Sequence, residues 1–259
     1  MASTARTRKR TEREQDDYSK LRSAAERLTP ASWFSSQWAA NRQFVELMTL
    51  AFDGLRNEDA QLSGALTRGK LAAEYRERGA PGLSYWVYEH NLVYPVFKAW
   101  ALKHRVLWDE APTAQWKKPF DAATREPPAN DTRQQKLIDL QVLLDKSGDE
   151  RWLFEAQWLN NERGVTHAQQ DAVKLHHVRL ARGKKPTRLF LLGLWYNYTD
   201  SIDEDLEWVR NCPDGTNPAF LGLFPSTVPG KKKGPPVDGY HFVAVFEVTG
   251  RPLAAARRR

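Results

Sequence analysis

The chain contains a single cysteine, Cys212, among its 259 residues. One cysteine excludes an intrachain disulfide and a cysteine-based zinc site, and it is typical of proteins in a reducing compartment. No apolar run reaches the length of a membrane span, and the first residues lack the hydrophobic stretch of a secretory signal. A glycine-rich phosphate-binding loop and a Gly-x-Ser-x-Gly turn are also missing. We therefore expect a soluble, cytoplasmic protein with no membrane partner.

Positive charge exceeds negative charge along the chain. There are 39 Lys and Arg residues against 32 Asp and Glu residues, which gives a formal net charge of +7. A basic balance favours association with polyanions through phosphate contacts. Much of the excess lies at the two ends, where charge runs are usually solvated arms. An internal cluster consists of Arg179, Arg182, Lys184, Lys185 and Arg188.

The sequence divides into a tail and one domain. Residues 1–15 are polar and basic and have few apolar anchors, which predicts a disordered tail. Residues 16–259 suit a single domain, with a helical part over 16–104 and an α/β core over about 105–250. We expect a mixed β-sheet flanked by helices.

Apolar spacing predicts most of the secondary structure. Residues 17–62 and 84–103 have helical spacing, and Pro95 should kink or split the second helix. Four prolines make residues 109–135 an irregular connector. Further elements are predicted as a short strand at 106–108, a helix at 167–182 that Thr166 and Gln169 cap, a strand at 189–198, a helix at 202–210 and a strand at 240–248.

The most informative segment is a predicted hairpin with acids in both strands. Residues 137–144 carry Asp139, and residues 151–159 carry Glu155 and Gln157. Side chains alternate along a strand, so Glu155 and Gln157 share one face, about 6.5–7 Å apart. These residues could line the wet face of an antiparallel sheet. However, both faces of this strand are largely apolar, and a buried strand seldom tolerates an idle carboxylate.

The register of the hairpin decides whether the two acids meet. An even closure of the turn, with Asp145 opposite Glu150, would place Asp139 opposite Ala156 and therefore on the face away from Glu155. A bulge or an odd-length loop would bring Asp139 opposite Glu155 or Gln157. A joint site requires this irregular register or a bent strand start.

Two carboxylates held on neighbouring strands provide the oxygen ligands that Mg²⁺ prefers. Such an ion lowers the pKa of a bound water and neutralises charge on a phosphodiester under attack. The pattern therefore indicates phosphodiester hydrolysis with Mg²⁺ as the cofactor.

The arrangement resembles the PD-(D/E)xK nuclease superfamily, above all type II restriction endonucleases. The family pattern is an acid in one strand, then acid-x-Lys in the next strand, then a helix and another apolar strand. Residues 136–200 match this order, and the resemblance implies a restriction-endonuclease-like fold in which Asp139 and Glu155 bind the metal. Gln157 stands where Lys is usual, a variant that some active restriction enzymes share. A neutral amide at this position could orient the attacking water but could not act as its base.

In some members of the family the lysine has moved to an adjoining helix, and Lys174 is the candidate for that role here. The alternative interpretation of Lys174 is a solvated lysine on a helix surface. The segment after the second strand holds Asn160, Asn161 and Arg163, which could read bases or could merely cap the helix. Together with Lys184, Lys185 and Arg188 these residues are the candidate DNA contacts.

The resemblance implies a type II restriction endonuclease that cuts double-stranded DNA at a defined sequence. A homodimer or a higher homo-oligomer is expected, because two-fold symmetry matches palindromic sites and delivers one active centre to each strand. The alternatives are a repair or recombination nuclease of the same fold, a DNA-binding protein that has lost catalysis, and a basic protein-interaction domain without a nucleic-acid role.

Overall fold

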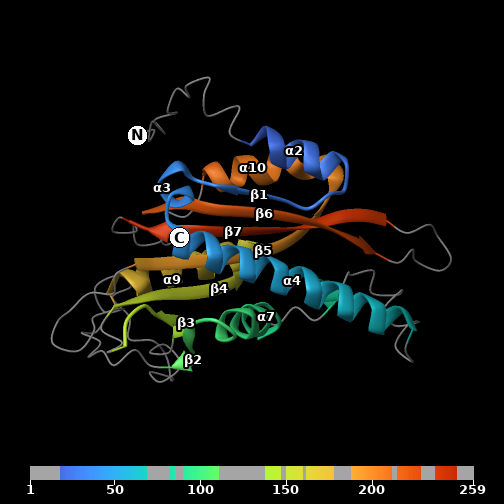
Figure 1. Cartoon of the computed structure of the whole chain (residues 1–259). Helices are drawn as coiled ribbons and strands as arrows, with labels where there is room; N and C mark the ends of the chain where they lie inside the picture. Colours follow the sequence, from blue (N-terminus) through green and yellow to red (C-terminus); the bar gives the residue numbers. More distant parts are fainter. Residues whose placement is uncertain are drawn as a thin grey trace, which may run out of the picture.

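A single mixed sheet forms the centre of the molecule (Figure 1). The computed structural model describes residues 18–68, 82–85, 90–110, 138–146, 150–159, 162–177, 188–211, 215–228 and 237–249. The sheet has seven strands in the order β1 (Ala31–Phe34), β6 (Thr216–Val228), β7 (Val237–Val248), β5 (Arg188–Tyr198), β4 (Arg151–Trp158), β3 (Ile138–Leu143) and β2 (Arg105–Glu110). β4 and β5 are parallel, whereas every other neighbouring pair is antiparallel. The expected mixed sheet with flanking helices is therefore confirmed.

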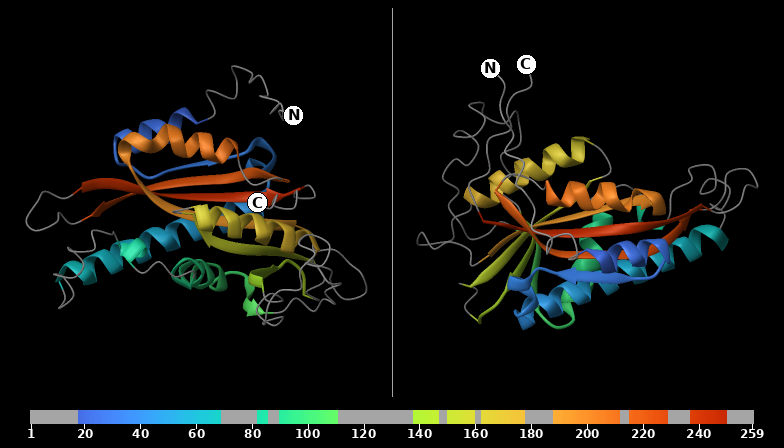
Figure 2. Two further views of the ribbon diagram at one scale, coloured as in Figure 1. Left: turned by 180° about the vertical axis from the view of Figure 1, so that it is seen from behind. Right: turned by 90° about the horizontal axis from the view of Figure 1, so that it is seen from above.

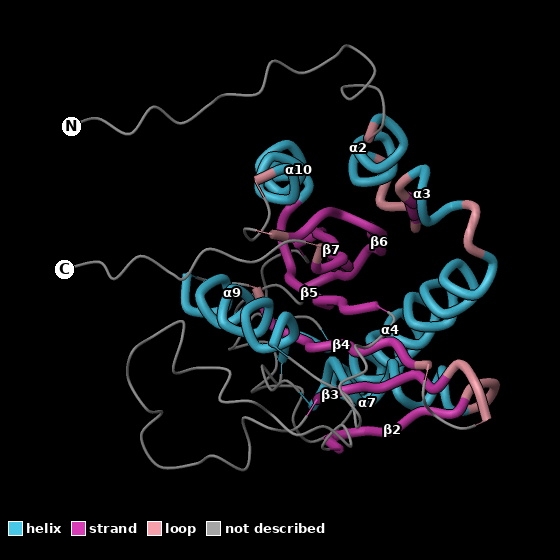
Figure 3. Tube along the Cα trace, turned by 90° about the vertical axis from the view of Figure 1, so that its left-hand side faces the viewer, coloured by secondary structure: helices cyan, strands magenta, loops and turns pink. Residues whose placement is uncertain are grey.

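Helices cover both faces of this sheet. They are α2 (Ser19–Glu26), α3 (Ser36–Ala39), α4 (Arg42–Arg68), α6 (Gly82–Tyr85), α7 (His90–Ala101), α9 (Glu162–His177) and α10 (Ile202–Arg210), with a 3₁₀ turn, η3 (Thr199–Ser201), before α10. α4 and α7 lie on one face, and α9 and α10 lie on the other (Figures 2 and 3). No helix in the described ranges is long and apolar enough to span a membrane.

Each face of the sheet has its own hydrophobic core. Trp152, Phe154 and Ala156 of β4 point toward α4 and α7 and pack with Trp100. Leu153 points the other way and packs in a second core, which includes Leu175 of α9 and residues of α2 and α10. Because β4 is covered on both faces, polar side chains on it lose contact with water, and Glu155 is only 2% exposed.

Several predicted elements agree with the structure. The helix expected at 202–210 is α10 with the same bounds, and the strands expected at 189–198 and 240–248 are β5 and β7. The short strand at 106–108 is the middle of β2. Pro95 lies inside α7. The tail at 1–15 and most of the connector lie outside the described residues.

Two strands were not predicted. β1 lies within the part expected to be helical, where Trp33 and Phe34 fit a helical spacing as well as a strand. β6 contains Pro218 and Pro225, which disfavour strands because proline lacks a backbone N–H. β1 pairs with β6 only over residues 220–223, so both prolines lie where β6 has only β7 beside it. Pro218 also borders a register irregularity.

Candidate active site

The β3–β4 hairpin has the irregular register that a joint acid site requires. Leu143 is opposite Arg151 and Leu140 is opposite Phe154. The amide of Leu144 donates to the carbonyl of Glu150, which places Leu144 rather than Asp145 opposite Glu150. Continuing this register by one residue beyond Leu140 places Asp139 opposite Glu155. The even closure is therefore wrong, and both acids lie on one face of the sheet.

Asp139 interrupts the backbone ladder at this point. Its Oδ2 accepts a hydrogen bond of 2.7 Å from the backbone N–H of Ala156. Asp139 is half-buried, so this bond orients its carboxylate while part of the side chain still faces solvent. One carboxylate is therefore anchored beside Glu155 and accessible to a ligand.

Glu155 forms a buried ion pair with the helix above it. Nζ of Lys174 lies 2.6 Å from Oε1 of Glu155, and Lys174 is only 8% exposed. The interpretation of Lys174 as a solvated helix-surface lysine is therefore wrong. Burial raises the pKa of Glu155 well above its usual value, and repulsion from Asp139 adds to the rise, which Lys174 only partly offsets.

Lys174 stays charged in these surroundings. Burial lowers the pKa of its ammonium, but the carboxylates of Glu155, Asp171 and Asp139 outweigh burial, so the pKa lies above its usual value. A permanent ammonium therefore stands over Glu155. Lys174 lies on α9, which is the position that a catalytic lysine on an adjoining helix would require.

Gln157 pairs with an acid that the sequence analysis missed. Nε2 of Gln157 donates a hydrogen bond of 2.8 Å to Oδ2 of Asp171. Burial raises the pKa of Asp171 to about 7; Lys174 opposes the rise, and Asp139 adds to it. Asp171 and Lys174 are three residues apart on α9 and therefore share one helix face. That spacing is the signal that could have identified Asp171 once Lys174 was a candidate.

The ionisable side chains around Glu155 carry more negative than positive charge. Asp139, Glu155 and Asp171 bring three carboxylates against one ammonium, so the formal charge is −2 when all four are ionised. The described residues contain no group of three His, Cys, Asp or Glu side chains that could hold a metal ion. Mg²⁺ is usually bound by one or two carboxylates, with water and substrate phosphate completing its shell. Asp139 and Glu155 fit that requirement in ligand type and in charge.

A small pocket adjoins Glu155 and Gln157. Its other lining residues are Leu159, Ala168, Leu191, Leu192, Gly193, Trp208 and Phe246. Its volume of about 10 Å³ is close to what a single water molecule needs. Gly193 permits this packing, because a Cβ there would collide with the side chain of Leu159. Glu155 and Gln157 contribute polar side chains to this lining.

Of the candidate DNA contacts, the structure describes only Arg163 and Arg188. Asn160, Asn161, Lys184 and Lys185 lie outside the described residues, so these contacts stay predictions. Arg163 lies in the first turn of α9 rather than in a loop, because α9 begins at Glu162. Thr166 is consequently inside the helix and does not cap it.

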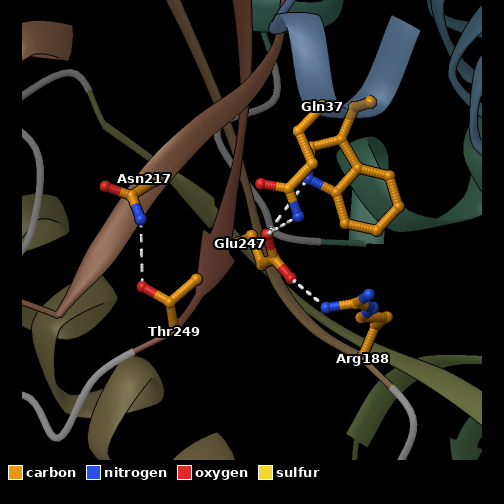
Figure 4. Close-up of polar contacts among 6 residues, drawn as sticks. Gln37, Arg188, Asn217, Glu247 and Thr249 are labelled. Atoms are coloured by element: carbon orange, nitrogen blue, oxygen red, sulfur yellow. Dashed lines mark hydrogen bonds and ion pairs between the residues drawn. The ribbon is translucent and has the colours of Figure 1, made fainter. Parts of the chain in front are cut away.

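Arg188 is exposed, but other side chains of the protein bind its guanidinium. Its Nη1 lies 2.9 Å from Oε1 of Glu247, and its guanidinium lies over the ring of Trp38, 5.3 Å from the ring centroid. The other carboxylate oxygen of Glu247 accepts hydrogen bonds from Trp38 at 3.1 Å and Gln37 at 3.5 Å (Figure 4). At the same end of the sheet, the Asn217 side chain donates to Thr249. Arg188 therefore connects β5, β7 and α3, and a DNA contact by Arg188 stays a prediction.

Comparisons of the chain with protein-family models, with curated proteins and with solved structures find no match. The functional argument therefore rests on the residues of this chain and on their geometry.

Proposed function

We propose that this protein is a Mg²⁺-dependent endonuclease of the type II restriction class, which hydrolyses phosphodiester bonds in double-stranded DNA at a specific sequence. The observation that carries the proposal is the buried Glu155 carboxylate, with Lys174 at 2.6 Å and Asp139 opposite it on the neighbouring strand. Holding three acids beside one lysine, with Glu155 and Lys174 buried, is costly for stability, and such clusters are typical of functional sites.

The order of elements supports the resemblance to PD-(D/E)xK nucleases. Asp139 comes from β3, Glu155 and Gln157 come from β4, α9 follows, and the chain then enters β5 parallel to β4. The missing lysine of the motif is compensated in space, because Lys174 reaches Glu155 from α9. A lysine at position 157 would reach the same region from the strand.

Each residue then has a distinct task in hydrolysis. Asp139 and Glu155 would hold Mg²⁺, which when bound supplies an acidified water and neutralises charge on the phosphate. Lys174 offsets the burial of Glu155 and places positive charge where the scissile phosphate would approach. Gln157 orients the attacking water through its amide.

Double-stranded DNA and a second copy of the chain are the partners that this function requires. The net charge of +7 favours DNA association, which should weaken as salt rises. A homodimer would present one active site to each strand of a palindromic sequence.

Cleavage of bacteriophage genomic DNA tests the proposal. The purified protein would be incubated with the DNA and millimolar Mg²⁺, beside an EDTA control and the Asp139→Ala variant. Discrete bands that vanish in both controls would support a site-specific nuclease. A smear would instead identify a repair or nonspecific nuclease, and intact DNA that shifts on a gel would identify a binding protein. Intact DNA without salt-sensitive binding would exclude a nucleic-acid role.

A further inference from the structure

The side-chain amide of Gln157 is oriented by its partner. An amide has a donor edge, the NH₂ group, and an acceptor edge, the carbonyl oxygen. Oδ2 of Asp171 accepts from Nε2 of Gln157 at 2.8 Å, so the donor edge faces α9. An ionised carboxylate offers only acceptors, so Asp171 in this form excludes the flipped amide, in which two oxygens would face each other.

We propose that Asp171 is a positioning residue of the active site, which holds the amide of Gln157 so that its carbonyl oxygen, and not its NH₂ group, is offered to the attacking water. This inference rests on the proposed nuclease function. It explains how glutamine can serve at a position where lysine is usual, because an unrestrained amide could present either edge.

The geometry of the two elements supports a paired arrangement. Glu155 and Gln157 are two residues apart on β4, about 6.5–7 Å along the strand. Asp171 and Lys174 are neighbours on one face of α9, with Cβ atoms about 5–6 Å apart. The similar spacings let one helix face contact both strand residues, with Lys174 on Glu155 and Asp171 on Gln157. Glu155 is thus paired with the ammonium of Lys174, and the amide of Gln157 is paired with the carboxylate of Asp171.

The contact has no evident packing role. Ala168, Ala172 and Leu175 already bury the apolar face of α9. Asp171 is half-buried, and its partial desolvation opposes the charged form and raises the pKa of this carboxyl. An acid retained at such a cost is better explained by the orientation of Gln157 than by stability.

Two measurements on the full chain test the inference. The first is the ¹H–¹⁵N signal of the Gln157 side-chain amide, identified by its absence in Gln157→Glu. We expect slow proton exchange in the unsubstituted protein and fast exchange in Asp171→Ala. The second is Mg²⁺-dependent DNA cleavage, in which Asp171→Ala should lower kcat by about 100-fold, the typical cost of a misplaced reacting group, with KM unchanged.

A reversed pair controls for a purely structural effect. In Gln157→Glu/Asp171→Asn, the amide of residue 171 can donate to the carboxylate of residue 157, which restores the bond and leaves one oxygen for the water. We expect this double variant to recover most of the kcat that Asp171→Asn loses. Equal kcat values in Asp171→Ala and the unsubstituted protein would overturn the inference, as would fast exchange of the Gln157 amide in the unsubstituted protein.

The amide signal and the cleavage assay together distinguish failure of this inference from failure of the proposed function. If the unsubstituted protein cuts no DNA, the nuclease function is wrong, and the role of Asp171 in presenting a water falls with it. The amide signal then still decides whether Asp171 orients Gln157. If the protein cuts DNA but Asp171→Ala leaves kcat unchanged, the nuclease function stands and the inference about Asp171 is wrong.

Discussion

Nζ of Lys174 on α9 lies 2.6 Å from Oε1 of Glu155 on β4, and both side chains are almost completely buried. A buried ion pair of this kind holds the helix over the strand and places a cation beside two acids. Its energetic and catalytic contributions can be measured separately.

Lys174→Met should destabilise the protein by about 3–5 kcal/mol, because it leaves the buried carboxyl of Glu155 without its partner. It should also abolish DNA cleavage. The double variant Glu155→Gln/Lys174→Met should recover stability but not activity. Urea unfolding measures the first effect. Lys98→Met is the matched control, because Lys98 forms an exposed pair with Glu58 at 2.8 Å, which should contribute at most ~1 kcal/mol.

Mg²⁺ should raise the melting temperature of the protein, because a ligand that binds only the folded state stabilises it. Asp139→Asn should lose this increase, since one of the two proposed carboxylate ligands becomes a neutral amide. Thermal unfolding with and without Mg²⁺ provides the measurement. Asp53→Asn, at an exposed acid on α4, should keep the full increase. An equal increase in Asp139→Asn would argue against a metal at this position.

The contribution of Asp171 to stability should fall as pH rises from about 4 to about 7. The pKa of Asp171 is raised from 3.8 to about 7, so over this interval the folded state holds a proton that the unfolded chain has released. The favourable contribution is therefore complete below pH 3.8 and is lost as pH approaches 7. Glu155 acts in the same direction, because its pKa is also raised.

Urea unfolding at several pH values in this interval checks the sign. Asp171→Asn should flatten the profile, because an asparagine does not titrate. A profile that rises between pH 4 and pH 7 and does not change in Asp171→Asn would contradict the burial of this acid.

Arg188→Met should destabilise the protein by about 1 kcal/mol, because solvent screens this half-exposed guanidinium. Glu247 would lose its partner at 2.9 Å but keep its hydrogen bond from Trp38. Urea unfolding measures the loss. If Arg188 mainly contacts DNA, the variant should instead unfold like the unsubstituted protein and bind DNA more weakly.

The sequence predicted the β3–β4 hairpin well because its signals are local. The alternation of apolar residues in β4, the polar turn and the position of Asp139 all lie within about twenty residues. α10 was predicted with its correct ends because Asp203, Glu204 and Asp205 mark its first turn, where acids favour a helix start.

The features that the sequence did not predict depend mostly on contacts between distant segments. Asp171 was overlooked because its partner, Gln157, lies on another element. The spacing of Asp171 and Lys174 indicates a shared face of α9 but not the contact with Gln157. β1 was assigned to a helix because its role appears only when it meets β6, almost two hundred residues later. The start of α9 was placed too late because Thr166 and Gln169 imitate a capping box inside the helix.

The pairing of β1 with β6 also has a consequence for biosynthesis. Ala31 is opposite Leu223 and Phe34 is opposite Phe220, so one edge of the sheet joins an early segment to a late one. During translation, β1 stays unpaired until residues 220–223 have left the ribosome. A strand of four residues is a short target for mispairing during that interval, whereas a longer apolar strand would expose more backbone to other nascent chains. The shortness of β1 therefore limits the backbone that is open to mispairing before β6 is made.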